Sequence, residues 1–169
     1  RKMGNYSKAP DFFVIKDTRE QSGYYFSKYG TCAGMVEQKL DTGDYAIQGM
    51  EDKCCVERKG SVEELAINLG QKKHAFLNEI ERMKPFPHKF IVLEFTLEDL
   101  VNFPENTRIP EKQKASIKIT GKYMLKCLME FQLHDKVHIL FCGNKHNAFL
   151  TVSSIFKRVN EMYTIGRKK

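Results

Sequence analysis

The sequence predicts an α/β domain in which helices pack on the faces of a mixed, largely buried sheet. Residues 90–95 and 137–142 are strongly apolar runs with one polar residue each, which is typical of strands covered on both faces. Helix-like segments alternate with these runs, and strand-like segments joined by short glycine-containing links precede them. The 169 residues, of which 41% are hydrophobic, are enough for one domain with a sizeable core.

The first half of the chain contains the earlier strands. Residues 12–15 form a short apolar run, which predicts a buried strand that ends in a polar cluster. Three further strand-like segments follow at 35–40, 44–48 and 53–58. Because the links between these three are short and contain glycine, we expect an antiparallel meander.

Capping residues mark the predicted helices. Ser61 and Glu64 have the spacing of a capping box, and Gly70 is a plausible end for that helix. The other helices are expected at 74–83, just after Thr96, at 116–133 and from Asn144 onward. The apolar stripe of the last helix consists of Phe149, Val152, Phe156, Val159 and Tyr163.

The charge balance favours polyanionic partners such as nucleic acid. Lys and Arg number 28 against 21 Asp and Glu, which gives a formal net charge of +7. No window approaches the roughly 18 apolar residues of a membrane helix, so we expect no membrane association. No glycine-rich phosphate loop occurs, so we expect no nucleotide cofactor.

The five cysteines predict a reducing, intracellular setting. Their number is odd, and their spacing matches no metal-binding pattern. Cys54 and Cys55 would point to opposite faces of a strand, so buried small hydrophobic residues are the simplest interpretation. We expect a single domain over 1–169, with an N-terminal tail at 1–10 and a basic C-terminal tail at 166–169.

One group of charged residues suits phosphodiester hydrolysis. Glu57 and Lys59 lie two apart on a predicted strand and therefore share a face. A hairpin with the preceding strand could bring Asp44 beside Glu57. Two carboxylates can bind a hard cation that activates water, and a lysine can offset charge growing on the phosphate. From spacing alone, a solvated salt-bridged triplet is the commoner alternative.

Three segments, in order along the chain, resemble motifs of the XPF-like structure-specific endonucleases. Residues 14–20 resemble the Asp-x-Arg-Glu strand end, 40–45 the Gly-Asp-Tyr segment, and 56–59 the Glu-Arg-Lys signature. The resemblance implies a restriction-endonuclease-like fold and a nuclease domain that uses Mg²⁺ or Mn²⁺. It also implies endonuclease activity on branched or flapped DNA in DNA repair or recombination. Residues 96–136 match the family poorly.

The resemblance also implies roles for individual residues. Asp44 and Glu57 would be the first metal ligands, and Glu20 would complete the set directly or through water. Lys59 would be the phosphate-facing base or electrostatic stabiliser. The other motif positions, for which a supporting salt-bridge network is the alternative, are Asp17, Arg19 and Arg58.

Basic residues outside the motifs are candidates for phosphate contacts. A lysine recurs every four residues near the predicted 116–133 helix, and this spacing predicts an oblique basic ridge. The ridge would comprise Lys114, Lys118, Lys122 and Lys126. Lys72, Lys73 and Arg58 are further candidates for DNA contacts, closer to the motifs. A solvated helix face is the alternative for the ridge.

Three questions stay open at this level. The chain could be a noncatalytic DNA-binding subunit of a nuclease complex rather than an enzyme. It could form a homodimer through the last helix, with Ile155 and Met162 facing outward, or be monomeric. No tandem helix-hairpin-helix module is recognisable, so we expect an excised nuclease domain or a small stand-alone one, cytoplasmic if bacterial or phage and nuclear if eukaryotic.

Overall fold

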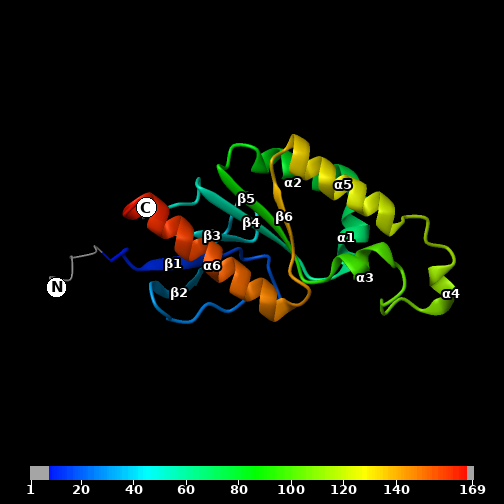
Figure 1. Cartoon of the computed structure of the whole chain (residues 1–169), viewed down its shortest axis with the longest axis horizontal. Helices are drawn as coiled ribbons and strands as arrows, with labels where there is room; N and C mark the ends of the chain where they lie inside the picture. Colours follow the sequence, from blue (N-terminus) through cyan, green and yellow to red (C-terminus); the bar gives the residue numbers. More distant parts are fainter. Residues whose placement is uncertain (1–7, 167–169) are drawn as a thin grey trace, which may run out of the picture.

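The computed structural model describes residues 8–166, which form a six-stranded sheet with helices on both faces (Figure 1). The strands are β1 (Phe12–Lys16), β2 (Cys32–Glu37), β3 (Tyr45–Ile47), β4 (Cys54–Lys59), β5 (His88–Leu93) and β6 (His138–Phe141). The helices are α1 (Val62–Leu69), α2 (Lys73–Met83), α3 (Leu97–Val101), α4 (Glu111–Lys114), α5 (Gly121–His134) and α6 (Lys145–Thr164). The predicted α/β class is confirmed. The predicted tails lie largely outside the described residues, at 1–7 and 167–169.

The strand order is β2-β1-β3-β4-β5-β6, and β3 is antiparallel to both of its neighbours. The other neighbouring pairs are parallel. The predicted three-strand meander is therefore wrong, because β1 lies between β2 and β3 and only β3 and β4 form the expected antiparallel pair. The apolar β1 takes an interior position, so the link from β2 to β3 must cross the end of β1 rather than turn tightly.

The sheet separates two large apolar cores. One core lies under α1, α2 and α5 and includes Leu65, Phe76 and Leu128. The other lies under α6, which crosses the near face of the sheet in Figure 1, and includes Tyr45 and Phe156. Cys54 and Cys55 lie in opposite cores, as the strand alternation predicts, and all five cysteines are free.

The predicted caps hold three helices at their first turns. Ser61 Oγ accepts a hydrogen bond from Glu64 N at 3.2 Å at the start of α1. Thr96 and Asp99 form a complete capping box at α3. Asn144 Oδ1 accepts from Asn147 N at 2.8 Å at the start of α6. These polar side chains accept hydrogen bonds from backbone N–H groups that the first turn of a helix leaves free. Because donor and acceptor are only three residues apart, the sequence pattern alone predicts these helix starts.

The predicted helix at 116–133 is wrong at its beginning. The helix α5 begins at Gly121, and Thr120 Oγ1 caps it by accepting from Tyr123 N at 3.1 Å. A Cβ atom at position 121 would lie 1.9 Å from the carbonyl oxygen of Leu100, so α5 can start against α3 only with glycine there. The β-branched residues before Thr120 also favour an extended chain over a helix. The short helix α4 is a separate element.

The apolar stripe of α6 is buried over most of its length. Val152, Phe156 and Val159 are buried against the sheet, whereas Tyr163 is 40% exposed and its hydroxyl lies 2.9 Å from His88 Nε2. Within residues 8–166, no helix is long and apolar enough to cross a bilayer.

Gly121→Ala should destabilise the domain by about 2 kcal/mol or more, since the new methyl group must displace the Leu100 carbonyl. Elsewhere in a helix, replacing glycine with alanine typically stabilises by about 1 kcal/mol, so the sign of the change is informative. Urea unfolding followed by circular dichroism would measure it. The neighbouring exposed variant Lys122→Ala serves as control, and a stabilised Gly121→Ala protein would contradict the proposed close contact.

Candidate active site

The carboxyl end of β4 places a buried carboxylate and a buried ammonium on one face of the sheet. Lys59 Nζ donates to Glu57 Oε1 at 3.1 Å, and the two residues are only 4% and 9% exposed. Lys59 Nζ also lies 4.8 Å from the centre of the Phe76 ring and 3.9 Å from Glu64 Oε1. The face is therefore the one covered by α1 and α2.

Asp44 joins this pair from the neighbouring strand. Because Tyr45 pairs with Val56 in the antiparallel ladder, the preceding residue Asp44 lies opposite Glu57. Asp44 N donates to Val56 O at 2.8 Å, and Asp44 Oδ2 accepts from Arg58 N at 2.7 Å. The structure thus brings together the three residues that the hairpin argument selected.

Burial makes the two carboxyl groups of this site weaker acids than usual. Burial raises the pKa of Glu57 to about 7, although the charge of Lys59 opposes the rise. Burial and the negative charge of Glu57 raise the pKa of Asp44 well above its ordinary value. For Lys59, burial alone would lower the pKa, but Glu57 and Glu64 raise it overall. Two neighbouring carboxylates that resist ionisation in this way would be stabilised by a bound cation.

Arg58 points to the opposite face and lies in a buried ion-pair network. Its Nε and Nη2 donate to the two oxygens of Glu94 at 2.5 and 3.0 Å, and its Nη1 donates to Glu20 Oε1 at 3.3 Å. The guanidinium carbon lies 5.6 Å from the centre of the Tyr24 ring, in the core under α6. The side chain is 9% exposed, so the geometry agrees with the alternative of a supporting network rather than with a DNA contact.

Asp17 and Arg19 hold the link that leads to Asp44. Asp17 is buried, and its Oδ1 accepts from Leu40 N at 2.8 Å. Arg19 Nε donates to Asp17 Oδ2 at 2.8 Å, and Arg19 Nη2 donates to Leu40 O at 2.7 Å. Burial alone would raise the pKa of Asp17, but the hydrogen bonds from Arg19 and Leu40 lower it overall. These two motif residues therefore tie the end of β1 to the link between β2 and β3.

Sequence reasoning missed Glu94 and Tyr24. Glu94 follows β5 directly, and its N–H donates to Lys59 O at 2.9 Å, which places it beside the end of β4. The available signal was an acid at the carboxyl end of an apolar parallel strand, where sites often form.

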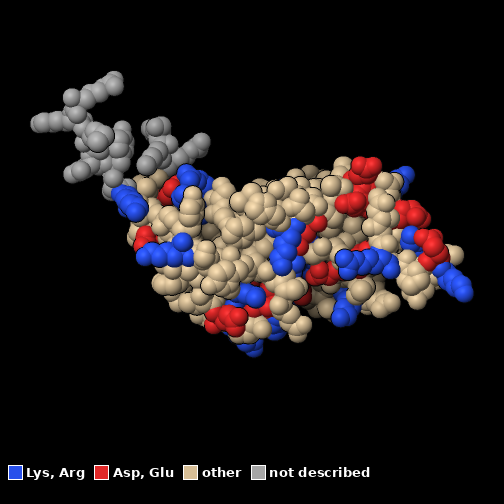
Figure 2. All heavy atoms as spheres, turned by 90° about the horizontal axis from the view of Figure 1, so that it is seen from below, with Lys and Arg blue, Asp and Glu red and all other residues tan. Residues whose placement is uncertain are grey.

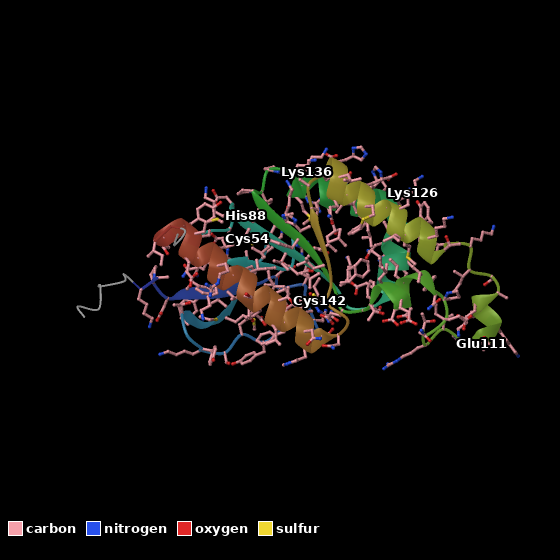
Figure 3. All side chains as sticks on the ribbon, viewed as in Figure 1. Cys54, His88, Glu111, Lys126, Lys136 and Cys142 are labelled. Carbon is pink, nitrogen blue, oxygen red and sulfur yellow. The ribbon has the colours of Figure 1, made fainter. Side chains whose placement is uncertain are left out.

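Tyr24 is 2% exposed, and among the described residues its hydroxyl has no hydrogen-bond partner. Figure 3 locates the region, since Cys142 lies near this end of β5, while Cys54 and His88 mark the starts of β4 and β5.

The predicted four-lysine ridge is wrong, because its members lie on three different segments. Of the four, only Lys122 and Lys126 share α5, one turn apart, and both are exposed. Figure 3 labels Lys126 on this helix. Lys114 belongs to α4 and pairs with Glu105 and Glu111 at 3.4 and 2.7 Å, while Lys118 lies in the irregular link.

The basic residues nearer the motifs lie at the start of α2. Lys72 is the exposed residue before this helix, and Lys73 Nζ donates to Tyr123 Oη at 2.5 Å. On the face seen in Figure 2, basic side chains are scattered among acidic ones rather than gathered in a single patch. That face therefore presents no single basic surface to a polyanion.

The donor set fits a hard divalent cation. Among residues 8–166, no group of three or more His, Cys, Asp or Glu side chains is arranged to hold a metal ion. Mg²⁺, however, is commonly bound by one or two carboxylates, with water and substrate phosphate completing its shell. Asp44 and Glu57 supply two such carboxylates, whereas Glu20 is paired with Arg58 instead of joining them.

Comparisons with known proteins identify the family and the fold of the chain. The family model described as the ERCC4 domain matches residues 16–154. Two solved structures, of XPF from Aeropyrum pernix alone and in complex with DNA, match with TM-scores of 0.58 and 0.57 and sequence identities of 16% and 15%. The matches cover 86% and 89% of this chain but only 65% and 66% of those chains, so this chain spans just under two thirds of their length. No curated protein matches it by sequence.

Stability should fall as the pH rises from about 5 to 8 in the absence of divalent cations. The unfolded chain ionises Glu57 near its ordinary pKa of 4.5, whereas the folded chain holds the proton to about pH 7. Protonation of Glu57 thus favours the folded state below pH 4.5, and this contribution is lost as the pH rises to about 7. The loss should be about 2 to 3 kcal/mol, and urea unfolding at several pH values would measure it.

The variant Glu57→Gln should show a smaller fall in stability over this pH range, because an amide cannot ionise. Glu98→Gln, at an exposed position in the first turn of α3, makes the same chemical change and should keep the wild-type slope. Equal slopes in wild type and Glu57→Gln would contradict the raised pKa.

Proposed function

Because the chain belongs to the ERCC4 domain family, we propose that it is a divalent-cation-dependent endonuclease that hydrolyses phosphodiester bonds in DNA. The observation that supports this most directly is the pair of carboxylates, partly buried Asp44 and buried Glu57, beside the ammonium of Lys59. A noncatalytic subunit that only binds DNA needs no such arrangement, because buried like charges cost stability.

Each residue of this group has a role in the proposed reaction. Asp44 and Glu57 would hold Mg²⁺ or Mn²⁺, which supplies an oriented and acidified water together with charge compensation at the phosphate. The N–H of Arg58 orients the Asp44 carboxylate through Oδ2. Lys59, held at 3.1 Å by Glu57, would offset negative charge that develops on the phosphate.

DNA is the proposed substrate. The net charge of +7 favours a polyanion, and one of the matched structures is a complex of the Aeropyrum pernix XPF with DNA. Lys72, Lys122 and Lys126 are exposed and could contact backbone phosphates. We propose branched or flapped DNA as the substrate shape and a role in repair or recombination, in line with the motif resemblance.

Self-association through α6 is part of the same proposal. Met162 is 47% exposed and Leu150 is 51% exposed, so one side of α6 keeps apolar surface, whereas Ile155 is only partly exposed. A second copy that covers this surface would bring two cleavage sites to one branched substrate.

The conservative variants Asp44→Asn and Glu57→Gln should each abolish Mg²⁺-dependent cleavage while leaving much of the DNA affinity. Each keeps the shape and a hydrogen bond of the residue that it replaces, but removes a charge needed to hold the cation. Cleavage of a labelled panel of branched, flapped and linear DNA, with and without a chelator, would measure the effect. Asp41→Asn, at an exposed position just before the site, should cleave like wild type.

The same panel separates the two candidate functions. If the wild-type chain binds the DNA panel but cleaves no member with Mg²⁺ or Mn²⁺, the noncatalytic subunit replaces the enzyme as the conclusion. Wild-type turnover by either site variant would show that the reaction takes place elsewhere.

Lys59→Ala should lower the turnover rate on the order of 100-fold and change DNA affinity much less, because its charge matters most where charge develops in the transition state. Single-turnover rates and binding by fluorescence anisotropy would separate the two effects. Lys112→Ala, at an exposed position in α4, is the matched control, with an unchanged turnover rate expected. A loss confined to affinity would make Lys59 a binding residue only.

A further inference from the structure

The guanidinium of Arg58 lies buried between two carboxylates from distant parts of the chain. Glu94 follows β5 and Glu20 follows β1, and the three side chains are only 9%, 5% and 12% exposed, in the order Arg58, Glu94, Glu20. A buried guanidinium requires a nearby negative charge. The carboxylates of Glu94 and Glu20 therefore share the positive charge of one guanidinium, that of Arg58.

The sharing is unequal. Glu94 binds Arg58 in a bidentate manner: its two oxygens accept hydrogen bonds from Nε and Nη2 at 2.5 and 3.0 Å. Glu20 accepts only from Nη1, at the longer distance of 3.3 Å. Paired, parallel contacts of this kind are the stronger arrangement for arginine and carboxylate. Glu94 is thus the main counter-charge of Arg58, and Glu20 is held loosely.

Glu20 also acts on the opposite face of the sheet. Its negative charge is one of the causes that raise the pKa of Asp44, together with burial and the charge of Glu57. The main chain also places Glu20 near Asp44, since Glu20 N donates to Asp17 O at 3.1 Å and Asp17 N donates to Asp44 O at 2.8 Å.

From this geometry we infer that Glu94 is a positioning residue for the proposed cation site: by supplying the main counter-charge of Arg58, it leaves Glu20 bound to Arg58 through a single, longer contact, which Glu20 can give up to support a cation held by Asp44 and Glu57. The inference rests on the proposed function, since it assigns a role toward that cation. Glu94 itself contacts Arg58 and not the cation site.

The variant Glu94→Gln tests this inference by removing one charge while keeping the shape of the side chain. Arg58 would then take Glu20 as its counter-charge, and the cation site would lose its support. We expect Mn²⁺ affinity, measured by isothermal titration calorimetry without DNA, to fall about 10-fold, the lower end for loss of a residue that supports a metal ligand. Glu98→Gln, the exposed control, should bind Mn²⁺ like wild type.

A second variant tests whether the guanidinium of Arg58 causes the loss of Mn²⁺ affinity. In Glu94→Gln/Arg58→Met, no guanidinium remains to capture Glu20, while the main-chain N–H of position 58 can still bind Asp44. We expect Mn²⁺ affinity within about 3-fold of wild type, because neutral replacement of both buried partners is often tolerated. Because removal of both charges would also repair a folding defect, the rescue supports the inference only if Glu94→Gln alone has the circular dichroism and urea midpoint of the wild type. If Glu94→Gln alone does not fold, weak Mn²⁺ binding by the folded double variant would still overturn the inference.

The outcomes separate this inference from the proposed function. If wild type binds no Mn²⁺, the proposed cation site is overturned, and this inference with it. If wild type binds Mn²⁺ and Glu94→Gln binds it equally well, only the role of Glu94 is overturned. Weak binding by the double variant, in a protein whose circular dichroism matches wild type, also overturns that role.

Discussion

The constraint on which the site depends is that three consecutive charged residues end a buried strand. Glu57, Arg58 and Lys59 belong to β4, which is flanked by β3 and β5 and covered by helices. Since charges away from water need partners, and since neighbouring side chains on a strand face opposite ways, this strand end needs two separate sets of partners. Glu57 and Lys59 pair with each other, and Arg58 recruits acids from the ends of β1 and β5.

The strand order makes those partners available. Because β1 lies between β2 and β3, the carboxyl ends of β1, β4 and β5 lie on the same side of the sheet, across the strand ends. The start of the antiparallel strand β3 lies there too. Asp17 and Arg19 fasten the crossing link at Leu40, just before the chain enters β3 with Asp44. Much of the polar network near the site therefore holds chain segments in place, which is what a precise arrangement of a few reacting groups requires.

Local patterns predicted the parts of this arrangement that depend on neighbours in sequence. The two-residue period placed Glu57 with Lys59, and the antiparallel pairing placed Asp44 opposite Glu57. The insertion of β1 and the partnership of Arg58 with Glu94, 36 positions apart, follow from pairings between distant strands, which no local pattern encodes. The prediction of the start of α5 was wrong partly for the same reason, since the need for glycine at position 121 comes from Leu100 in α3, although the β-branched residues before Thr120 are a local signal for an extended chain.

The contact from the main-chain N–H of Arg58 to Asp44 affects how the domain can evolve. A side-chain donor can be deleted by one substitution, but a backbone N–H is present in every amino acid except proline. The orientation of Asp44 is thus insulated from most changes at position 58, whereas the reacting groups are single side chains. A lineage could lose its chemistry by one substitution and keep a sound fold, so active and inactive paralogues with nearly the same shape are an expected product of this architecture.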